Sequence, residues 1–236
     1  MEFNKVGGQG LIQRAEFYTN LGTAGISGNA DRLAIFTSSM NSRLGLILTM
    51  ILRSQDSWDY DDINHTDFPI LTTSLVSGQQ DYSLPASENI LKLKRVEVLL
   101  DGVWKRAEKM DVNQDLESVN TTTNYLTSSP KYDIQYNSVF LYPTPTSAVT
   151  GGLKLWITRE PDYFTITDIT QEAGIDEMFQ EMIAVGASLD WALVKGLNNK
   201  NDLAAIWADY ENRLKVYYGD KETGNIGLSV YQDNYK

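Results

Sequence analysis

The chain has 236 residues, of which 42% are apolar and 22% are charged, and its formal net charge is −11. This is the composition of a globular protein with one domain or two closely joined ones. The strong excess of acid argues against a protein that grips nucleic acid by neutralising its phosphates. Because the chain has no cysteine, disulfides, thiolate metal sites and a cysteine nucleophile are excluded, and folding in a reducing cytoplasm is expected.

The sequence carries no signal of membrane insertion. The first ten residues have no apolar core of the kind that a secretory signal needs. The longest apolar stretch, 44–52, is too short and too interrupted to span a bilayer. We therefore expect no insertion into a membrane.

The N-terminal part of the chain has the periodicity of helices. Apolar residues recur at steps of three and four between residues 30 and 53, which predicts one long amphipathic helix with Asn29 as its N-cap. A shorter helix over 9–20 is expected before it, across the glycine-rich loop 22–28. The stripe of the long helix consists of Leu33, Phe36, Met40, Leu44, Ile47 and Ile51.

The C-terminal part predicts a helical hairpin. One helix is expected to begin at Asp176 and to end at Gly196, since these residue types favour those two positions. The next helix is expected to begin after Asn199 and to end at Gly219. Two helices joined by a short loop pack as an antiparallel pair.

Between the helices the pattern changes to alternating strands. Asp101-Gly102 predicts a tight two-residue hairpin turn, and Asn137-Ser138 predicts another. The alternation slips inside 91–100, and a β-bulge near Lys94–Arg95 restores it. The polar stretch 113–129 is predicted to be a long exposed loop. The expected strands are 70–75, 80–84, 91–100, 103–107, 132–136, 139–142 and 153–159.

These elements predict an α+β fold, in which a small bundle of N- and C-terminal helices carries an inserted antiparallel β-lobe. We expect residues 1–55 and 172–220 to form the bundle and residues 66–160 to form the lobe. Residues 221–236 have no period but are rich in apolar and aromatic side chains, so we interpret them as a docking strand or tail that needs a partner surface.

Charge is unevenly placed along the chain. Acids alone occupy 54–91 and 160–194, and a basic island lies between them. One interpretation is a solvated acidic surface with a single basic hairpin. The other is a ring interface, in which the basic island of one copy meets an acidic stretch of the next. The candidate residues for this pairing are Lys92, Lys94, Arg95, Lys105 and Arg106.

The sequence offers little support for catalysis, a cofactor or a metal. The single histidine, His65, has no triad signature around it, and Asp59-Tyr-Asp-Asp62 lacks the rest of a calcium loop. The glycines at 7–10 follow no strand, so they are no phosphate loop. We therefore expect no enzyme and no cofactor. Trp104 and Trp156 could stack on sugars or bases, but tryptophans in periodic segments more often anchor cores and interfaces.

Four stretches of the chain resemble tailed-phage head-to-tail connector adaptors, the group that includes tail tubular protein A, or gatekeeper, of podoviruses. They are Arg53-Ser-Gln-Asp-Ser-Trp58; Asp67-Phe-Pro with Gly78-Gln-Gln-Asp-Tyr-Ser-Leu-Pro85; Val139-Phe-Leu-Tyr-Pro-Thr-Pro145 leading into Leu153-Lys-Leu-Trp-Ile-Thr-Arg159; and Gly174-Ile-Asp-Glu-Met-Phe179, which opens a hairpin closing at Tyr217-Tyr-Gly219. The likeness is one of layout over most of residues 10–220.

The resemblance implies a virion structural protein, present in the host cytoplasm during assembly. Its copies would form a ring, typically of twelve, between the portal protein and a downstream tail or nozzle protein. The genome would pass through the lumen during ejection without specific binding, and the loop 113–129 would serve a tail-side junction or a gate. The C-terminal tail would dock on the portal through Ile226, Leu228, Val230, Tyr231 and Tyr235.

Three alternatives remain open on the sequence alone. A carbohydrate-binding or receptor-binding accessory protein of the virion would use Trp104 or Trp156 as a platform. An enzyme would need a pair of carboxylates with a perturbed pKa in a cleft. Another neck or stopper ring protein would differ from an adaptor only in its place in the virion.

Overall fold

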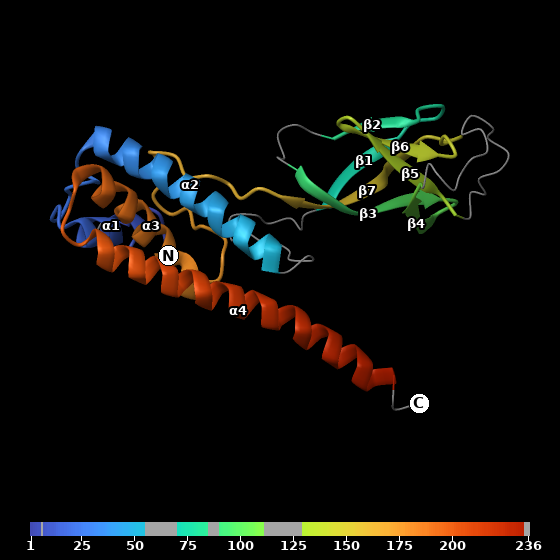
Figure 1. The fold of residues 1–236 in the computed structure, drawn as a ribbon. Helices are drawn as coiled ribbons and strands as arrows, with labels where there is room; N and C mark the ends of the chain where they lie inside the picture. The colour runs from blue at the N-terminus through green and yellow to red at the C-terminus, as the bar shows by residue number, and fades with distance from the viewer. Residues whose placement is uncertain (6, 55–69, 85–89, 111–128, 234–236) are drawn as a thin grey trace. The chain divides into compact units, whose positions relative to one another are not determined.

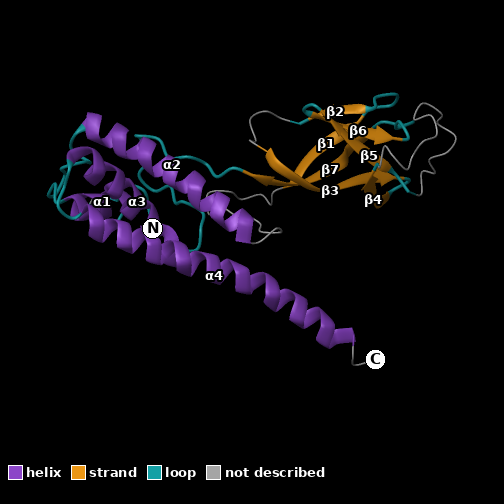
Figure 2. Cartoon of the chain, viewed as in Figure 1, coloured by secondary structure: helices purple, strands orange, loops and turns teal. Residues whose placement is uncertain are grey.

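The computed structural model describes residues 1–5, 7–54, 70–84, 90–110 and 129–233, with residues 220–233 described by their backbone alone. The chain divides into two compact units. We call Met1–Thr66 with Pro161–Lys236 the helical unit, and Asp67–Glu160 the β-unit. The predicted α+β class, with N- and C-terminal helices packed together and a sheet inserted between them, is confirmed (Figures 1 and 2).

The helical unit contains α1 (Leu11–Thr19), α2 (Ala30–Ser54), α3 (Glu177–Lys195) and α4 (Lys200–Asp233). The N-cap predicted for α2 is confirmed, since the backbone N–H of Arg32 donates to Asn29 Oδ1 at 3.0 Å. The apolar stripe of α2 packs against α3, which is buried on most of its surface, and α3 in turn packs against α1 and α4. Fully buried side chains of this core include Leu11, Ile12, Phe36, Met40, Leu44, Ile47, Ile51, Met182, Ile183, Leu214 and Tyr218.

α2 is long and apolar enough, by length and composition, to cross a membrane. Core helices pass the same test, and the stripe from Phe36 to Ile51 lies inside the helical core. Ser38, Ser39, Asn41 and Arg43 interrupt the apolar character of α2 before the run 44–52.

The predicted boundaries of α3 and α4 are partly right. Gly196 ends α3 in the left-handed conformation, with φ +66°. Asp176 stands at the N-cap position, but its side chain makes no capping bond; its Oδ2 accepts the Tyr218 hydroxyl at 2.7 Å instead. The expected end of the last helix at Gly219 is wrong, because α4 continues through that glycine to Asp233. A lone glycine lowers helix stability by only about 1 kcal/mol and is no stop by itself.

The β-unit is one curled sheet in the order β1-β7-β3-β4-β5-β6-β2. All neighbours are antiparallel except β4 and β5, which pair in parallel through two residues on each strand, so the sheet is mixed and the predicted lobe is not purely antiparallel. The strands are β1 (Ile70–Leu75), β2 (Asp81–Ser83), β3 (Ile90–Leu100), β4 (Val103–Lys109), β5 (Lys131–Gln135), β6 (Ser138–Tyr142) and β7 (Val149–Arg159).

The hairpin turns follow the sequence closely. Asp101 and Gly102 both have positive φ, as the predicted tight turn between β3 and β4 requires. The second turn is shifted by one residue from the prediction, because Gln135 pairs with Ser138 and leaves Tyr136-Asn137 at the turn. Tyr136 adopts φ +53° there.

The predicted bulge in β3 is confirmed, and a second one precedes it. The register against β7 shifts between Leu93 and Arg95 and again between Ile90 and Lys92. Each bulge adds one residue, which keeps Ile90, Leu93 and Val96 on the side of the sheet that carries the core. Leu93 packs against the core of the β-unit, whereas Leu91 is 44% exposed.

Candidate partner interface

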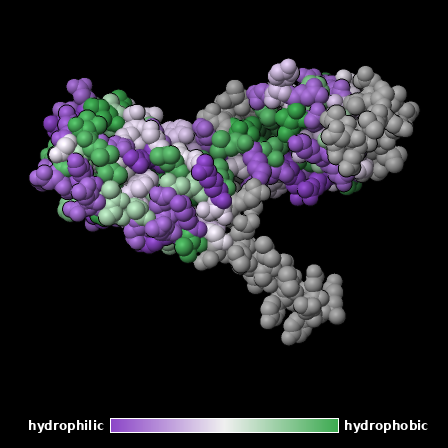
Figure 3. All heavy atoms as spheres, viewed as in Figure 1, coloured by the Kyte–Doolittle hydropathy of each residue, from purple (hydrophilic) through white to green (hydrophobic). Residues whose placement is uncertain are grey.

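Hydrophobic and hydrophilic residues are interspersed on the surface of the helical unit (Figure 3), and several of its large apolar side chains are exposed, two groups of them beside grooves. Between α2 and α3 lies a groove of about 190 Å³, whose rim carries Ile35 and Val194, the latter 80% exposed. A second, open groove of about 480 Å³ lies between α3 and α4 and has Met178 and Val216 on its rim. Exposed apolar side chains beside a groove make these two places candidates for contact with other proteins.

Three helices are locked together beneath the first groove. Asp190 of α3 accepts bonds from Ser39 at 2.6 Å and from Arg43 Nε at 3.0 Å, and it also pairs with Arg43 Nη2. The Arg43 guanidinium lies 4.7 Å from the centre of the Trp207 ring of α4. Gly186 lets these groups approach, because a Cβ there would lie 2.5 Å from Trp207. The groove therefore sits on a rigid support.

A second polar brace joins α1, α3 and α4. Glu181 accepts the hydroxyl of Tyr18 at 2.9 Å and that of Tyr210 at 3.2 Å, and Arg14 lies 3.4 Å from the same carboxylate. Burial and the bond to Glu181 raise the pKa of Tyr18 to about 12. Burial and the charge of Glu181 also raise the pKa of Tyr210. Both tyrosines therefore remain protonated donors at neutral pH.

A buried carboxylate holds the loop that enters α2. Glu16 of α1 is 5% exposed and accepts backbone N–H groups of Ile26 at 3.0 Å and Ser27 at 2.8 Å, together with the Ser27 hydroxyl. The glycine-rich loop is thereby fixed to α1, which determines where α2 starts.

The basic island is divided between the two faces of the sheet by the bulges of β3 and the alternation of β4. In a regular strand, one outward-facing residue lies between two that face the core. In β3 each bulge adds a second residue, between Ile90 and Leu93 and again between Leu93 and Val96. As a result Lys92, Lys94 and Arg95 lie on the outer face, away from the core. On β4, Arg106 is paired with Glu97 and lies on the same outer face. Lys105 is paired with the buried Val98, so it lies on the core side, apart from the other four.

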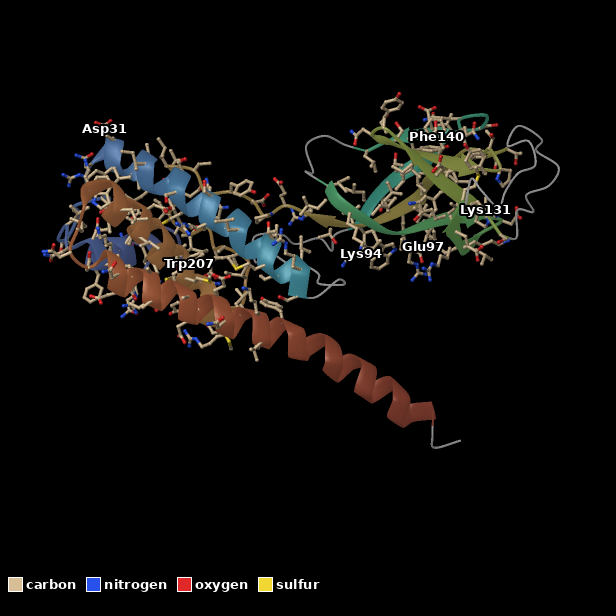
Figure 4. The ribbon with its side chains drawn as sticks, in the orientation of Figure 1. Asp31, Lys94, Glu97, Lys131, Phe140 and Trp207 are labelled. Atoms are coloured by element: carbon tan, nitrogen blue, oxygen red, sulfur yellow. The ribbon has the colours of Figure 1, made fainter. Side chains whose placement is uncertain are left out.

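Two tryptophans and one further lysine share this outer face. Lys154 of β7 is paired with Glu97, and its Nζ lies 3.9 Å from the centre of the Trp104 ring. Trp156 donates its indole N–H to Glu97 at 3.2 Å, and Glu97 also forms an ion pair with Arg95. We call Lys92, Lys94, Arg95, Trp104, Arg106, Lys154 and Trp156 the outer patch; Figure 4 labels Lys94 and Glu97 on β3.

Local sequence patterns missed Lys154 because it belongs to another strand. Its neighbours across the sheet, Glu97 and Trp104, are about fifty residues away in the sequence. The alternation of β7 places Lys154 and Trp156 on one face, which was the only signal available. Sheet order then brings them beside β3 and β4.

Much of the C-terminal acidic stretch is already engaged within the helical unit. Asp168 caps a turn by accepting the Thr165 N–H at 2.6 Å, and Glu172 pairs with the amino group of Met1 at 3.3 Å. Asp176, Glu181 and Asp190 hold the contacts given above. The exposed acids of the helical unit include Asp31, Glu177 and Asp202.

The described residues show no sign of a metal centre. Within the described ranges, no group of three or more His, Asp or Glu side chains is arranged to hold a metal ion. His65 and the Asp59–Asp62 turn lie outside the described residues, as does the greater part of the loop 113–129.

Comparison with known protein families decides the class of the protein. A model of the SU10 adaptor protein family matches residues 28–227, which include α2, the whole β-unit, α3 and most of α4. The chain belongs to this family. A search of curated proteins found no match to it.

Family membership makes the chain a phage head-tail adaptor, as the layout of its sequence indicated. The SU10 adaptor family is one of structural proteins and not of enzymes. The adaptor therefore acts in the virion by binding other virion proteins.

The structure also places the C-terminal residues predicted to dock on a partner. In the adaptor, Ile226, Leu228, Val230 and Tyr231 stand on the helical backbone of α4. The segment is thus a continuation of α4 and not an extended strand, which corrects the sequence prediction. Tyr235 lies outside the described residues.

Proposed function

We propose that copies of the adaptor form a closed ring, of about twelve chains by the resemblance described above, between the portal protein and the downstream tail or nozzle protein. The genome passes through the lumen of this ring during ejection. The observation that carries the proposal is the uneven distribution of charge between the two units. The helical unit has 11 basic and 20 acidic residues, a net charge of −9.

The β-unit carries far less negative charge, since it has nine Lys and Arg against eleven Asp and Glu, a net charge of −2. Counted over the described residues alone, the β-unit has nine basic and six acidic residues (+3), and the helical unit has ten and sixteen (−6). Unlike surfaces on one chain favour head-to-tail contacts between copies, and such contacts close into rings when the rotation between copies allows it. An acidic lumen suits the passage of DNA, because it offers no cations to hold the phosphates.

Within this ring, the basic island supplies the charge that sets the register between neighbours. The sequence prediction names Lys92, Lys94, Arg95, Lys105 and Arg106. Because Lys105 lies on the other face of the sheet, the remaining four of one copy face acids of the next. Charge pairing of this kind contributes more to orientation and specificity than to affinity.

The C-terminal end of α4 docks on the portal. Ile226, Leu228, Val230, Tyr231 and Tyr235 supply the apolar contacts, and a helix laid in a groove of the partner is a common way to bind such a segment. α4 supports this proposal by extending as a 34-residue helix to Asp233. Removing 224–236 is expected to abolish binding to the portal while leaving the helical core intact, since the fully buried Leu214 and Tyr218 precede the deletion.

The experiment is a measurement of mass in solution by light scattering, first for the adaptor alone and then with the cognate portal. A ring, or a monomer that joins the portal in a fixed ratio, is expected. A monomer that does not bind the portal contradicts the proposal and returns attention to the receptor-binding alternative. A chain truncated at residue 223 distinguishes the contact with the portal from the contact between copies. It is expected to lose binding to the portal but to keep the contact between neighbouring copies.

A further inference from the structure

We propose that the outer patch of the β-unit is the surface that contacts the neighbouring copy, and that it does so by receiving exposed acids of that copy's helical unit. This inference rests on the proposed ring and gives it a specific surface. The inference also changes the set of residues predicted to make this contact. It adds Lys154 and the two tryptophans to the basic island and leaves out Lys105.

The outer face of the sheet is strongly cationic. It carries Lys92, Lys94, Arg95, Arg106 and Lys154 against the two acids Glu97 and Glu108, a local net charge of +3. The bulges of β3 produce this concentration, because regular alternation would turn part of the island toward the core. A partner for this face must therefore be acidic.

The aromatic groups of the patch are held in place before any partner binds. Glu97 is 9% exposed and lies at the centre, where it accepts the Trp156 indole at 3.2 Å and pairs with Arg95. Its cross-strand neighbours are Lys154 and Arg106. Side chains fixed in this way lose little conformational freedom on binding, and tryptophan and arginine are the residues most enriched at interface hot spots.

A sugar ligand fits the two tryptophans less well than a protein partner does. A sugar platform needs an open ring face, yet Lys154 covers one face of Trp104 and the Arg95 guanidinium lies 6.0 Å from the Trp156 ring centre. Trp104 is 37% exposed, and aromatic residues are enriched at protein interfaces.

The acidic helical unit of another copy is the occupant whose charge matches. Its net charge is −9, and Asp31, Glu177 and Asp202 are exposed on it. A patch on one unit that binds the other unit of the next chain is a head-to-tail contact, which is the kind that generates rings. DNA is disfavoured by the two acids within the patch and by the charge of the whole chain.

The first test is assembly of the full-length double variant Arg106→Glu/Lys154→Glu on the cognate portal. We expect its half-assembly concentration to rise by about tenfold or more, because like charges would then meet across the contact. The matched control is Lys105→Glu/Lys109→Glu, which has the same change of charge on the same sheet but lies on the other face. The control is expected to assemble like the original chain, and melting temperatures measured for both variants show that each remains folded.

The outcomes separate this inference from the proposed function. If the original chain forms no ring on the portal, the proposed function is wrong. If it forms one and the Arg106→Glu/Lys154→Glu variant assembles equally well, the outer patch is not the contact. Equal loss in both double variants also overturns the inference, because it would reflect total charge and not one face.

The second test identifies the partner surface. Rings assembled from a mixture of ¹⁴N- and ¹⁵N-labelled chains are treated with a carbodiimide, which joins the Lys154 amine directly to a nearby carboxylate. We expect mixed-isotope links from Lys154 to acids of the helical unit. Links confined to one isotope would show a contact within one chain and would overturn the proposal.

Discussion

The loop that precedes α2 depends on a single buried carboxylate, and replacing it has a calculable cost. Glu16→Ala removes the acceptor of the Ile26 and Ser27 N–H groups and of the Ser27 hydroxyl. An unsatisfied buried donor costs about 1–3 kcal/mol. Ile26 is fully buried, whereas Ser27 is half-buried and can reach water, so we expect a total loss of about 3 kcal/mol.

The assay is urea unfolding followed by circular dichroism at 222 nm, which reports the helices of the helical unit. A loss of about 3 kcal/mol corresponds to a fall in melting temperature of about 6–12 °C for a chain of this size. Glu16→Gln keeps one oxygen acceptor and is expected to lose roughly half as much. Alanine is at least as good a helix former as glutamate, so α1 itself would not be weakened. A loss below about 0.5 kcal/mol for Glu16→Ala would refute the reasoning.

Three further predictions concern the braces of the helical unit. Gly186→Val forces side-chain atoms into Trp207 and Arg43 and should lower the unfolding free energy by about 1–3 kcal/mol in the same urea titration. Gly219→Ala places its methyl group in open space on α4 and should raise the unfolding free energy by up to about 1 kcal/mol. Because the pKa of Tyr18 is raised to about 12, the contribution of this side chain to stability is complete below pH 10 and is lost as the pH rises toward 12. Tyr18→Phe should therefore flatten a plot of unfolding free energy against pH between pH 10 and 12. An unchanged slope in that range would contradict this prediction. Asp190→Asn should lower the melting temperature by more than Asp202→Asn does, because only the former removes a charged partner from Arg43.

The helices were predictable because their signals are local. The stripe from Leu33 to Ile51 and the cap at Asn29 lie within one continuous stretch, and the structure follows them to within a residue or two. The failure at Gly219 has a physical cause. The sequence predicts a stop at Gly219, yet nothing at that site requires positive φ, and the helix tolerates the glycine.

The strands were predictable because their alternation is also a local signal, but their order in the sheet was not predictable. β7 begins at Val149, four residues before the prediction, and it includes Gly151-Gly152, residue types that weaken a strand pattern. Gly151 has φ +61° where the register against β1 shifts. The parallel contact of β4 with β5 has no local signature. The outer patch could be predicted only in part, since it joins residues of three strands through long-range pairing.

The central claim is that this adaptor works as a ring at the neck of the virion, and a cryo-EM reconstruction of the neck of purified virions tests it most directly. The account predicts a closed ring of identical copies directly below the portal, with the C-terminal end of α4 against the portal and the outer patch of each β-unit against the helical unit of the next copy. Virions whose neck lacks this chain, or that carry it as isolated copies away from the portal, would contradict the account.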